Sequence, residues 1–381
     1  MTPVELSRTV LRAVRCAVDG GELRVAVPER VVVTRPRPGG CGDYATNVAL
    51  QLARPAGQPA QRVAEVLKAH LADVDGIADV SVTGPGFLNI SLREGEGVGS
   101  AALVEEILRC GARYGFVEQD SSTGGGPGAN ARRDVRLWCA CEVRAVVVGD
   151  VVARLLRAQG VSVRTYCAGA VAREWEYVFG VRVEAEVPGG RHSGAGAGSA
   201  DGGGHSAHSD IQIRPVPAPA DPTPLGRDAG RWALLLPAGH DRPRVAGGEG
   251  DLHLLQRESN PLFRVRYAHA RTRALTRNAA DLGFRSRPGA VGGGAAEALV
   301  ALLADHPRVL ARAASLRAPD LLARHLVNVA DAVLPLLPTV LPVGEEKPSA
   351  AHRARLALAE AAGTVLAGGL SLLGIDAPDH L

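Results

Sequence analysis

The chain has 381 residues, of which 43 are Lys or Arg and 40 are Asp or Glu, so its formal net charge is only +3. This balance excludes a uniformly basic nucleic-acid coat protein and a polyacidic tail protein, but it does not exclude a local basic surface. Aromatic residues make up 3% of the chain, which argues against a surface that binds single strands mainly through base stacking.

The length predicts two or three domains, at roughly 100–200 residues each. We expect neither a membrane-spanning segment nor a secretory signal, and the six cysteines lack CxxC spacing, so a reducing, cytoplasmic environment is expected. Lysine occurs only at Lys68 and Lys347. Any mechanism that needs a catalytic lysine therefore has two candidates.

Residues 1–94 have the pattern of a compact α+β domain. Apolar residues at helical spacing predict helices over 4–18, 44–52 and 59–71, and alternation predicts strands over 31–33, 78–83 and 87–92. The last two strands are joined by Gly84-Pro85-Gly86, a turn signal.

Residues 95–182 begin with a helix to Leu108 and continue as a β-α-β unit. The unit consists of a strand over 136–141, a helix over 143–159 and a strand over 161–166, which is the start of a parallel doubly wound sheet. Residues 183–230 are rich in Gly and Pro and predict a disordered linker. Residues 231–255 supply one more strand, over 232–236, and a connector.

Four potential metal ligands lie in the predicted linker, namely His192, His205, His208 and Asp210. Nothing in a low-complexity tract fixes their geometry, so we predict no metal site there. Cys139-Ala-Cys141 is also too tightly spaced for an ordinary zinc pair.

Residues 256–381 predict a bundle of about five helices, over 262–280, 295–303, 307–314, 319–337 and 350–373, the last ended by Gly374. Residues 256–287 contain eight arginines against Glu258 and Asp281. On the first helix, an apolar stripe lies opposite Arg266, Arg273 and Arg277; the stripe is Val265, Ala268, Thr272, Leu275 and Ala279. Such a helix suits a phosphate backbone, although a merely solvated arginine face has the same pattern.

Both ends of the chain resemble arginyl-tRNA synthetases. The N-terminal likeness is Gly42-Asp43-Tyr44-Ala45-Thr46-Asn47-Val48-Ala49-Leu50 and Gly84-Pro85-Gly86-Phe87-Leu88-Asn89-Ile90; the C-terminal likeness is Asn260-Pro261, Tyr267-Ala268-His269-Ala270-Arg271 and Gly374-Ile375-Asp376-Ala377-Pro378. The resemblance implies an appended domain over 1–94 that contacts the tRNA elbow, with Phe87 and Asn89 at the contact. It also implies a DALR-type anticodon-binding domain over 256–381, and we expect Arg266, Tyr267, His269, Arg271, Arg273 and Arg277 to contact RNA there.

The middle of the chain departs from that family, whose Rossmann-like domain activates arginine with ATP. In register with the family's His-x-Gly-His signature, this chain has Cys139, Cys141 and Glu142, with Arg144 retained, and no lysine-rich second signature lies in 230–255. A glutamate at a helix start would repel phosphates, and about 90 residues leave too little room for the missing strand–helix units. We therefore expect the middle of the chain to be a truncated Rossmann-like remnant without a catalytic residue or a metal. For the whole chain we expect a fold that is α/β plus all-α.

Three functions compete at this point. The first is a non-catalytic binder of tRNA, of arginine tRNA or a related one, that does not bind DNA and needs no cofactor. The second is a divergent arginine–tRNA ligase, which would need ATP and Mg²⁺. The third is a protein-interaction module that has kept the folds and lost RNA binding. Cys139 or Cys141 as a thiol nucleophile is an outlying alternative, because Glu142 would oppose thiolate formation.

Overall fold

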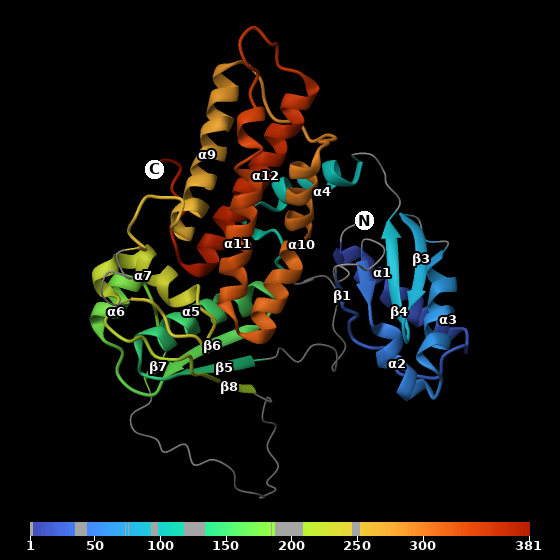
Figure 1. Ribbon diagram of the computed structural model, residues 1–381. Coiled ribbons are helices and arrows are strands. Elements are labelled where there is room, and N and C mark those ends of the chain that lie inside the picture. The colour runs from blue at the N-terminus through green and yellow to red at the C-terminus, as the bar shows by residue number, and fades with distance from the viewer. Residues whose placement is uncertain are drawn as a thin grey trace, which may run out of the picture. The chain divides into compact units, whose positions relative to one another are not determined.

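A computed structural model of the chain describes residues 3–34, 44–72, 74, 76–92, 98–117, 134–183, 185–186, 209–245 and 252–381. The chain divides into two compact units, Met1–Leu103 and Val104–Leu381, which are coloured blue to cyan and cyan to red in Figure 1. Each unit is described by itself.

The first unit packs helices against one face of an antiparallel sheet with the order β1-β2-β4-β3. Its elements are α1 (Pro3–Asp19), β1 (Val33–Thr34), β2 (Tyr44–Thr46), α2 (Val48–Ala56), α3 (Ala60–Ala72), β3 (Ile77–Thr83) and β4 (Phe87–Leu92). Leu88 and Ile90 of β4 are completely buried in the core, whereas Phe87 and Asn89 point to the opposite face because strand side chains alternate.

The strands over 78–83 and 87–92 are confirmed as β3 and β4. The predicted helix over 44–52 is wrong at its start, since Tyr44–Thr46 is strand β2 and pairs with β4. The Thr46 hydroxyl donates to the carbonyl of Val32 at 2.8 Å and accepts from the amide of Val48 at 3.3 Å. The partner strand, far away in sequence, thus overrides the local helical pattern.

The second unit contains a parallel sheet with the order β7-β6-β5-β8. Its elements are β5 (Asp134–Cys139), α5 (Val143–Ala158), β6 (Ser162–Cys167), α6 (Arg173–Phe179), β7 (Ala185–Glu186), β8 (Ser209–Ile213), the 3-10 turn η2 (Thr223–Leu225) and α7 (Gly226–Leu235). The predicted β-α-β unit is confirmed as β5, α5 and β6. The chain reverses its direction of winding between β5 and β8, so the topological switch point lies beside the start of α5.

Two predictions for this region are wrong. Residues 209–230 are not a linker, because Ser209–Ile213 pairs with β5 and Gly226 begins α7. Residues 232–236 are not a strand, since α7 extends to Leu235 and Trp232 is completely buried. Both elements depend on distant partners that local composition does not reveal.

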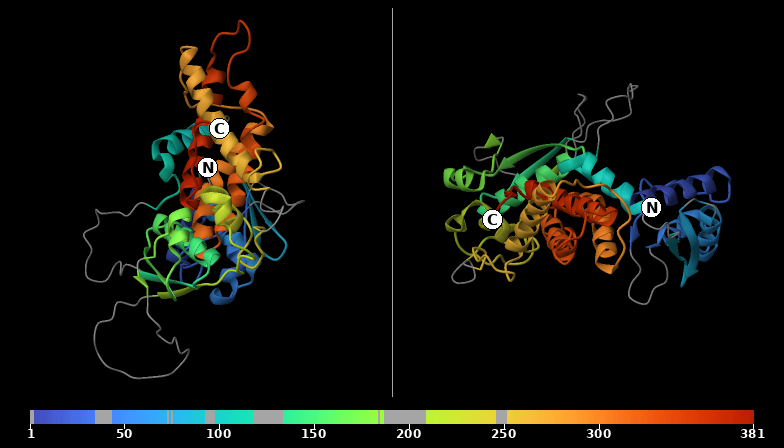
Figure 2. Two further views of the ribbon diagram at one scale, coloured as in Figure 1. Left: turned by 90° about the vertical axis from the view of Figure 1, so that its left-hand side faces the viewer. Right: turned by 90° about the horizontal axis from the view of Figure 1, so that it is seen from above.

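The rest of the second unit is helical. It contains α4 (Val98–Cys110, whose first residues belong to the first unit), η1 (Gly111–Arg113), α9 (Pro261–Asp281), α10 (Gly294–Leu316), α11 (Pro319–Val333), η3 (Leu337–Thr339) and α12 (Ala350–Leu373). Figures 1 and 2 show α9 to α12 side by side on one side of the parallel sheet. The predicted helices over 295–303 and 307–314 form one helix, α10, which continues through Pro307 because Leu303 and Leu310 bury one continuous stripe. That burial outweighs the roughly 3 kcal/mol penalty of an internal proline.

Among the described residues, α12 is the one helix that is long and apolar enough to cross a membrane, by length and composition alone. However, 78% of its most apolar window is buried inside the protein, where α12 packs against α9 and α11.

Candidate nucleic-acid interface

Helix α9 is held at its start by a side-chain cap. The side-chain oxygen Oδ1 of Asn260 accepts from the backbone amide of Leu262 at 3.0 Å, and Pro261 occupies the first turn. The predicted apolar stripe from Val265 to Ala279 is buried. The stripe fixes the rotation of the helix, so the opposite face is directed outward.

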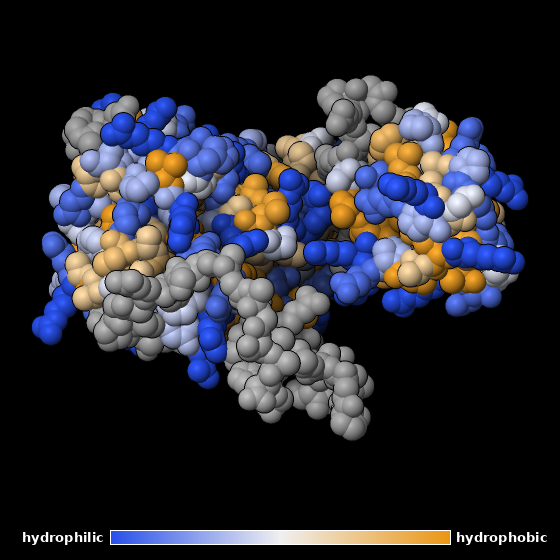
Figure 3. Space-filling view, turned by 90° about the horizontal axis from the view of Figure 1, so that it is seen from below, coloured by the Kyte–Doolittle hydropathy of each residue, from blue (hydrophilic) through white to orange (hydrophobic). Residues whose placement is uncertain are grey.

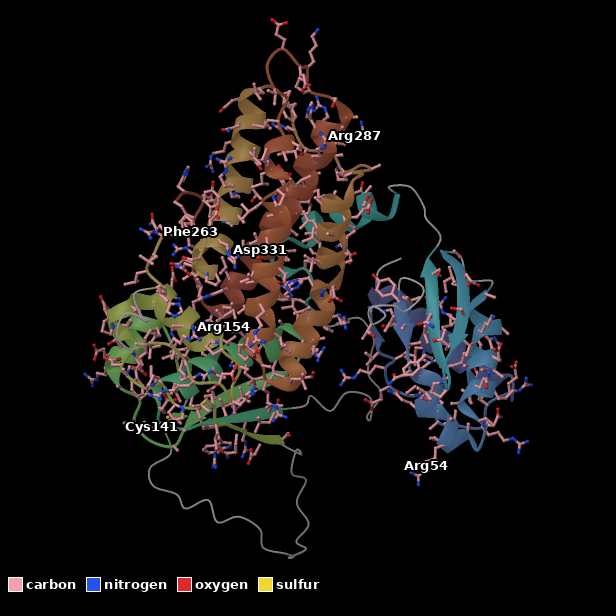
Figure 4. All side chains as sticks on the ribbon, viewed as in Figure 1. Arg54, Cys141, Arg154, Phe263, Arg287 and Asp331 are labelled. Atoms are coloured by element: carbon pink, nitrogen blue, oxygen red, sulfur yellow. The ribbon has the colours of Figure 1, made fainter. Side chains whose placement is uncertain are left out.

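That outward face presents a ladder of stacked side chains, Phe263, Tyr267 and Arg271, spaced four residues apart. The rings of Phe263 and Tyr267 stack with centroids 5.6 Å apart, and the Arg271 guanidinium lies 6.0 Å from the Tyr267 ring. Tyr267 is 38% exposed, and Figure 4 marks the position of Phe263 on α9. The sequence prediction included Tyr267 and Arg271 but missed Phe263, although its position four residues before Tyr267 was a readable signal.

The arginines beside the ladder are engaged by the protein's own acids. Arg266 pairs with Asp228 of α7 at 3.3 Å, and Arg273 pairs with Asp379 at 3.1 Å. Arg277 donates to the backbone oxygen of Asp379 at 3.3 Å. The Arg273 guanidinium lowers the pKa of Asp379, so this carboxylate stays charged. The expected face of free arginines is thus partly neutralised, and RNA contact by these three residues stays a prediction.

His269 does not lie on that outward face. Its side chain is buried, its Nδ1 lies 3.1 Å from the carbonyl oxygen of Pro378, and burial lowers its pKa. His269 therefore attaches the C-terminal segment to α9, and the prediction that it contacts RNA does not fit its burial.

In the first unit, Phe87 and Asn89 share the outer face of β4. Phe87 is 41% exposed, while Asn89 is buried and donates from Nδ2 to the Thr83 hydroxyl at 2.6 Å. The turn before Phe87 requires glycine at Gly86, where φ is +133° and a Cβ would lie 2.9 Å from the backbone oxygen of Ala60. The turn leaves the Phe87 ring exposed to solvent. The Asn89 side chain stabilises the turn through its hydrogen bond to Thr83.

At the switch point of the parallel sheet, Glu142 caps α5. Its carboxylate accepts from the amides of Arg144 at 3.0 Å, Ala145 at 2.9 Å and Ala218 at 3.0 Å. The first two amides belong to the helix N-terminus, the position at which this fold usually binds a phosphate. The chain's own carboxylate occupies that anion site.

Arg144 lies beside this cap and is completely buried. Its guanidinium donates to five carbonyl oxygens, those of Val216, Leu234, Pro237, Ala238 and Asp241, at 2.7–3.1 Å. Burial lowers its pKa, and Glu142 opposes that shift. Arg144 therefore orders the segment after α7, and none of its five N–H groups is left for a ligand.

The two cysteines that we aligned with the family's first signature lie in different environments. Cys139 is buried, and burial raises the pKa of its thiol to about 12; Cys141 is exposed and its Sγ lies 3.0 Å from the carbonyl oxygen of Ala170. Within the described ranges, no three His, Cys, Asp or Glu side chains form a metal-binding group. His192, His205 and His208 lie outside those ranges, and Asp210 lies in β8.

Comparisons with known proteins give the same family at both ends of the chain. A family model described as "Arginyl tRNA synthetase N terminal domain" matches residues 6–92, and one described as "DALR anticodon binding domain" matches residues 265–381. The arginine–tRNA ligase of Renibacterium salmoninarum is 43% identical over 171 residues, which cover 43% of this chain and 30% of that protein. The chain therefore matches less than a third of the length of this relative.

A more distant relative aligns along its whole length. The arginine–tRNA ligase of Pseudarthrobacter chlorophenolicus is 26% identical over 563 positions, covering 100% of both chains. Because this chain has 381 residues, 182 of the 563 positions face gaps in it.

Solved structures show the same fold. Arginyl-tRNA synthetase from Thermus thermophilus superposes with a TM-score of 0.63 at 14% identity and covers 100% of both chains. The enzyme from Plasmodium falciparum gives 0.66 at 8% identity and covers 100% of this chain and 99% of that one. With one family model at each end and relatives and folds of the same kind along its length, the chain belongs to the arginyl-tRNA synthetase family.

Proposed function

We propose that this protein binds tRNA without activating arginine. The anticodon arm would contact α9, and the tRNA elbow would contact the outer face of the first sheet at Phe87. The observation that carries the proposal is the ladder of Phe263, Tyr267 and Arg271 on the domain that matches the anticodon-binding model. Tyr267 and Arg271 are exposed, and Phe263 is partly exposed. Arginine tRNA or a related tRNA is the expected partner, in the cytoplasm.

The chemistry of the ladder suits the unpaired bases of an RNA loop. Splayed-out bases stack on aromatic rings and on the planar guanidinium of arginine. Arg271 supplies both the plane and a positive charge, and among the described residues no acidic side chain lies within ion-pair distance of it. Phe87 is exposed in the same manner on the first unit.

Glu142 supports the second half of the proposal. Formation of an adenylate builds negative charge on the α-phosphate, which a helix N-terminus and cationic groups normally stabilise. Here the Glu142 carboxylate takes the two free amides of α5, so a phosphate would meet a negative charge. The residues at this position do not fit the phosphates of ATP.

Filter binding to tRNA tests the RNA contact. Tyr267→Ala and Arg271→Glu should each weaken binding by about 10-fold, since one stacked base contributes roughly 1–3 kcal/mol. Tyr177→Ala is the matched control, because Tyr177 lies on α6 and is 90% exposed. Equal affinities of all three variants would contradict the assignment of α9. Absence of tRNA binding by the wild-type chain would instead favour the protein-interaction module.

The second candidate is a divergent arginine–tRNA ligase, which is how the relatives are named. ATP–pyrophosphate exchange with arginine and tRNA separates it from the first. We expect no exchange above background, with a relative that retains both ATP signatures as the positive control. Clear turnover would overturn the non-catalytic part of the proposal and leave the RNA contacts in place.

A further inference from the structure

Two cysteines come together at the carboxyl ends of neighbouring parallel strands. Cys167 is the last residue of β6, and Cys141 lies two residues beyond the end of β5. The strands are paired up to Cys139, which lies opposite Cys167, so the chain beyond β5 runs past the end of β6. Figure 4 labels Cys141 near the lower end of the second unit. Neither Cys141 nor Cys167 takes part in the RNA contacts proposed above.

The Cys141 side chain contacts both the loop after β6 and Cys167 itself. Its thiol donates to the carbonyl oxygen of Ala170 at 3.0 Å, and a Cβ at Gly169 would lie 3.7 Å from its sulfur. Burial raises the pKa of the Cys167 thiol, and hydrogen bonds from backbone amides lower it. Cys141 raises that pKa further, through its charge and through a hydrogen bond between the two side chains. The two sulfurs are therefore close neighbours, as a disulfide requires.

Cys139 is the alternative partner for Cys167, because the two lie side by side in the strand register. The Cys139 sulfur, however, fills the space over Gly149 of α5, where an added Cβ would overlap it. Burial also raises the pKa of the Cys139 thiol to about 12, which disfavours the reactive thiolate. Among the described residues at this edge of the sheet, Cys141 is exposed, whereas Cys139 and Cys167 are buried. Cys141 is therefore the thiol that an oxidant reaches first.

Two features of the surroundings bear on the oxidation of Cys141. The carboxylate of Glu142, the next residue, opposes formation of the Cys141 thiolate, but three backbone amides bind that carboxylate and offset part of its charge. The described surface seen from below, the side on which Cys141 lies, mixes hydrophilic and hydrophobic side chains (Figure 3). Such a surface contacts water, so we expect a water-soluble oxidant rather than one dissolved in lipid.

We propose that Cys141 and Cys167 form a reversible disulfide when the protein meets hydrogen peroxide. The Cys141 sulfur attacks the peroxide, the O–O bond breaks and water leaves, so Cys141 becomes a sulfenic acid. The Cys167 sulfur then attacks the Cys141 sulfur. The S–S bond forms, the S–O bond breaks, and the hydroxyl group leaves with the thiol proton as a second water. A dithiol reductant reverses the change by thiol–disulfide exchange.

The local structure allows this closure. Residues 140–142 and 168–170 lie outside helices and strands, so the two loops can shift as the sulfurs approach to about 2.05 Å. The disulfide would join the start of α5 to the loop after β6. In reducing compartments such bonds are transient and often serve as redox sensors. The inference does not depend on RNA binding.

Peptide mapping of the full chain tests the inference. The protein is treated with hydrogen peroxide, the remaining thiols are alkylated, and the chain is digested with trypsin. Peptide 137–144 contains Cys139 and Cys141, and peptide 165–173 contains Cys167. These two peptides should appear joined, with a mass two hydrogens below the sum of the two, and a dithiol should separate them. Tandem mass spectrometry of the joined pair should assign the bond to Cys141.

Two variants sharpen the assignment. Cys141→Ser should abolish the joined pair, whereas Cys139→Ser, the matched control within the same peptide, should retain it. Far-UV circular dichroism checks that each variant is folded. The inference is overturned if no joined pair forms, if the pair survives in Cys141→Ser, or if Cys141 is oxidised while Cys167 is still alkylated. A bond between Cys141 and any cysteine other than Cys167, in the same or a second molecule, would also overturn it.

Discussion

Three rings stack in the core of the helical part, and two of them belong to histidines. Tyr114 stacks on His306 with centroids 5.9 Å apart, and His306 stacks on His325 at 5.2 Å. His306 Nδ1 and His325 Nε2 are buried without a hydrogen-bond partner among the described residues. Burial lowers the pKa of His325 to about 4, with Asp305 raising it and Arg308 lowering it. Burial also lowers the pKa of His306 well below its ordinary value, and His325 adds to that effect.

Acid should therefore destabilise the bundle. Both histidines are neutral in the folded state and have an ordinary pKa near 6.5 when unfolded, so their contribution is complete above pH 6.5 and is lost as pH falls toward 4. The loss from His325 alone is about 3 kcal/mol by pH 4. Urea unfolding between pH 7 and pH 4 measures this loss, and His325→Gln should flatten the dependence of the free energy of unfolding on pH. An unchanged slope in that variant, with exposed His380→Gln as control, would assign the acid sensitivity elsewhere.

At the residue scale, the sequence located Glu142 at the start of α5 but not its role. Alignment with the family's His-x-Gly-His signature predicted that Glu142 would repel phosphate. It did not predict the three hydrogen bonds that the carboxylate accepts from backbone amides, because one of them comes from Ala218, which is distant in the sequence. The same limit applies to Arg266 and Arg273, whose acidic partners lie 38 and 106 residues away in the sequence. Contacts across such distances leave no periodic signal.

At the scale of elements, the C-terminal end of α12 is bound by arginines from α5 and α7, the helices beside the parallel sheet. Arg231 donates to the carbonyl oxygen of Leu373 at 2.7 Å and Arg154 to that of Ser371 at 3.2 Å. Arg231 is completely buried and also pairs with Asp150 at 2.6 Å. Cations at a helix C-terminus complement its partial negative charge, so the α/β part of the second unit stabilises the helical bundle.

Arg231→Met should destabilise the second unit by about 3–5 kcal/mol, because it leaves the largely buried carboxylate of Asp150 with less compensation. Arg227 offers a matched control, since it is exposed and donates to the neighbouring carbonyl oxygen of Gly374 at 3.3 Å. We expect Arg227→Met to change the free energy of unfolding by less than about 1 kcal/mol. If urea titrations give equal changes in the free energy of unfolding for the two variants, the buried ion pair stabilises the unit no more than the exposed contact of Arg227 does.

Whether a helix or strand could be predicted from the sequence depended on how regularly its apolar residues recur. The long helices of the bundle were predicted because apolar residues recur along them at helical spacing, and Gly374 was correctly read as the end of α12, where it has φ +73°. Strand β8 and helix α7 were missed because they are short and follow a Gly-rich tract. Their conformation depends on pairing with β5 and on the burial of Trp232.

At the scale of the whole molecule, a net charge of +3 conceals local cationic sites. Binding of tRNA should therefore weaken steeply with salt, since each phosphate contact contributes close to one unit to the log–log slope. Arg271→Glu should reduce that slope by about 1. Arg273→Glu should reduce it less, because Asp379 already neutralises Arg273. A salt-independent affinity would mean that phosphates are not contacted.

The Glu142 cap has a consequence for chemical probes of translation. A non-hydrolysable analogue of an aminoacyl adenylate carries a phosphate-like group, which a free helix N-terminus would bind. Here the amides of that N-terminus are already bonded to a carboxylate. We therefore expect this protein to keep its normal melting temperature in a cell lysate treated with such a compound, while any active ligase of the same lysate is stabilised. A drug that blocks arginine activation by ligases would then not bind this protein.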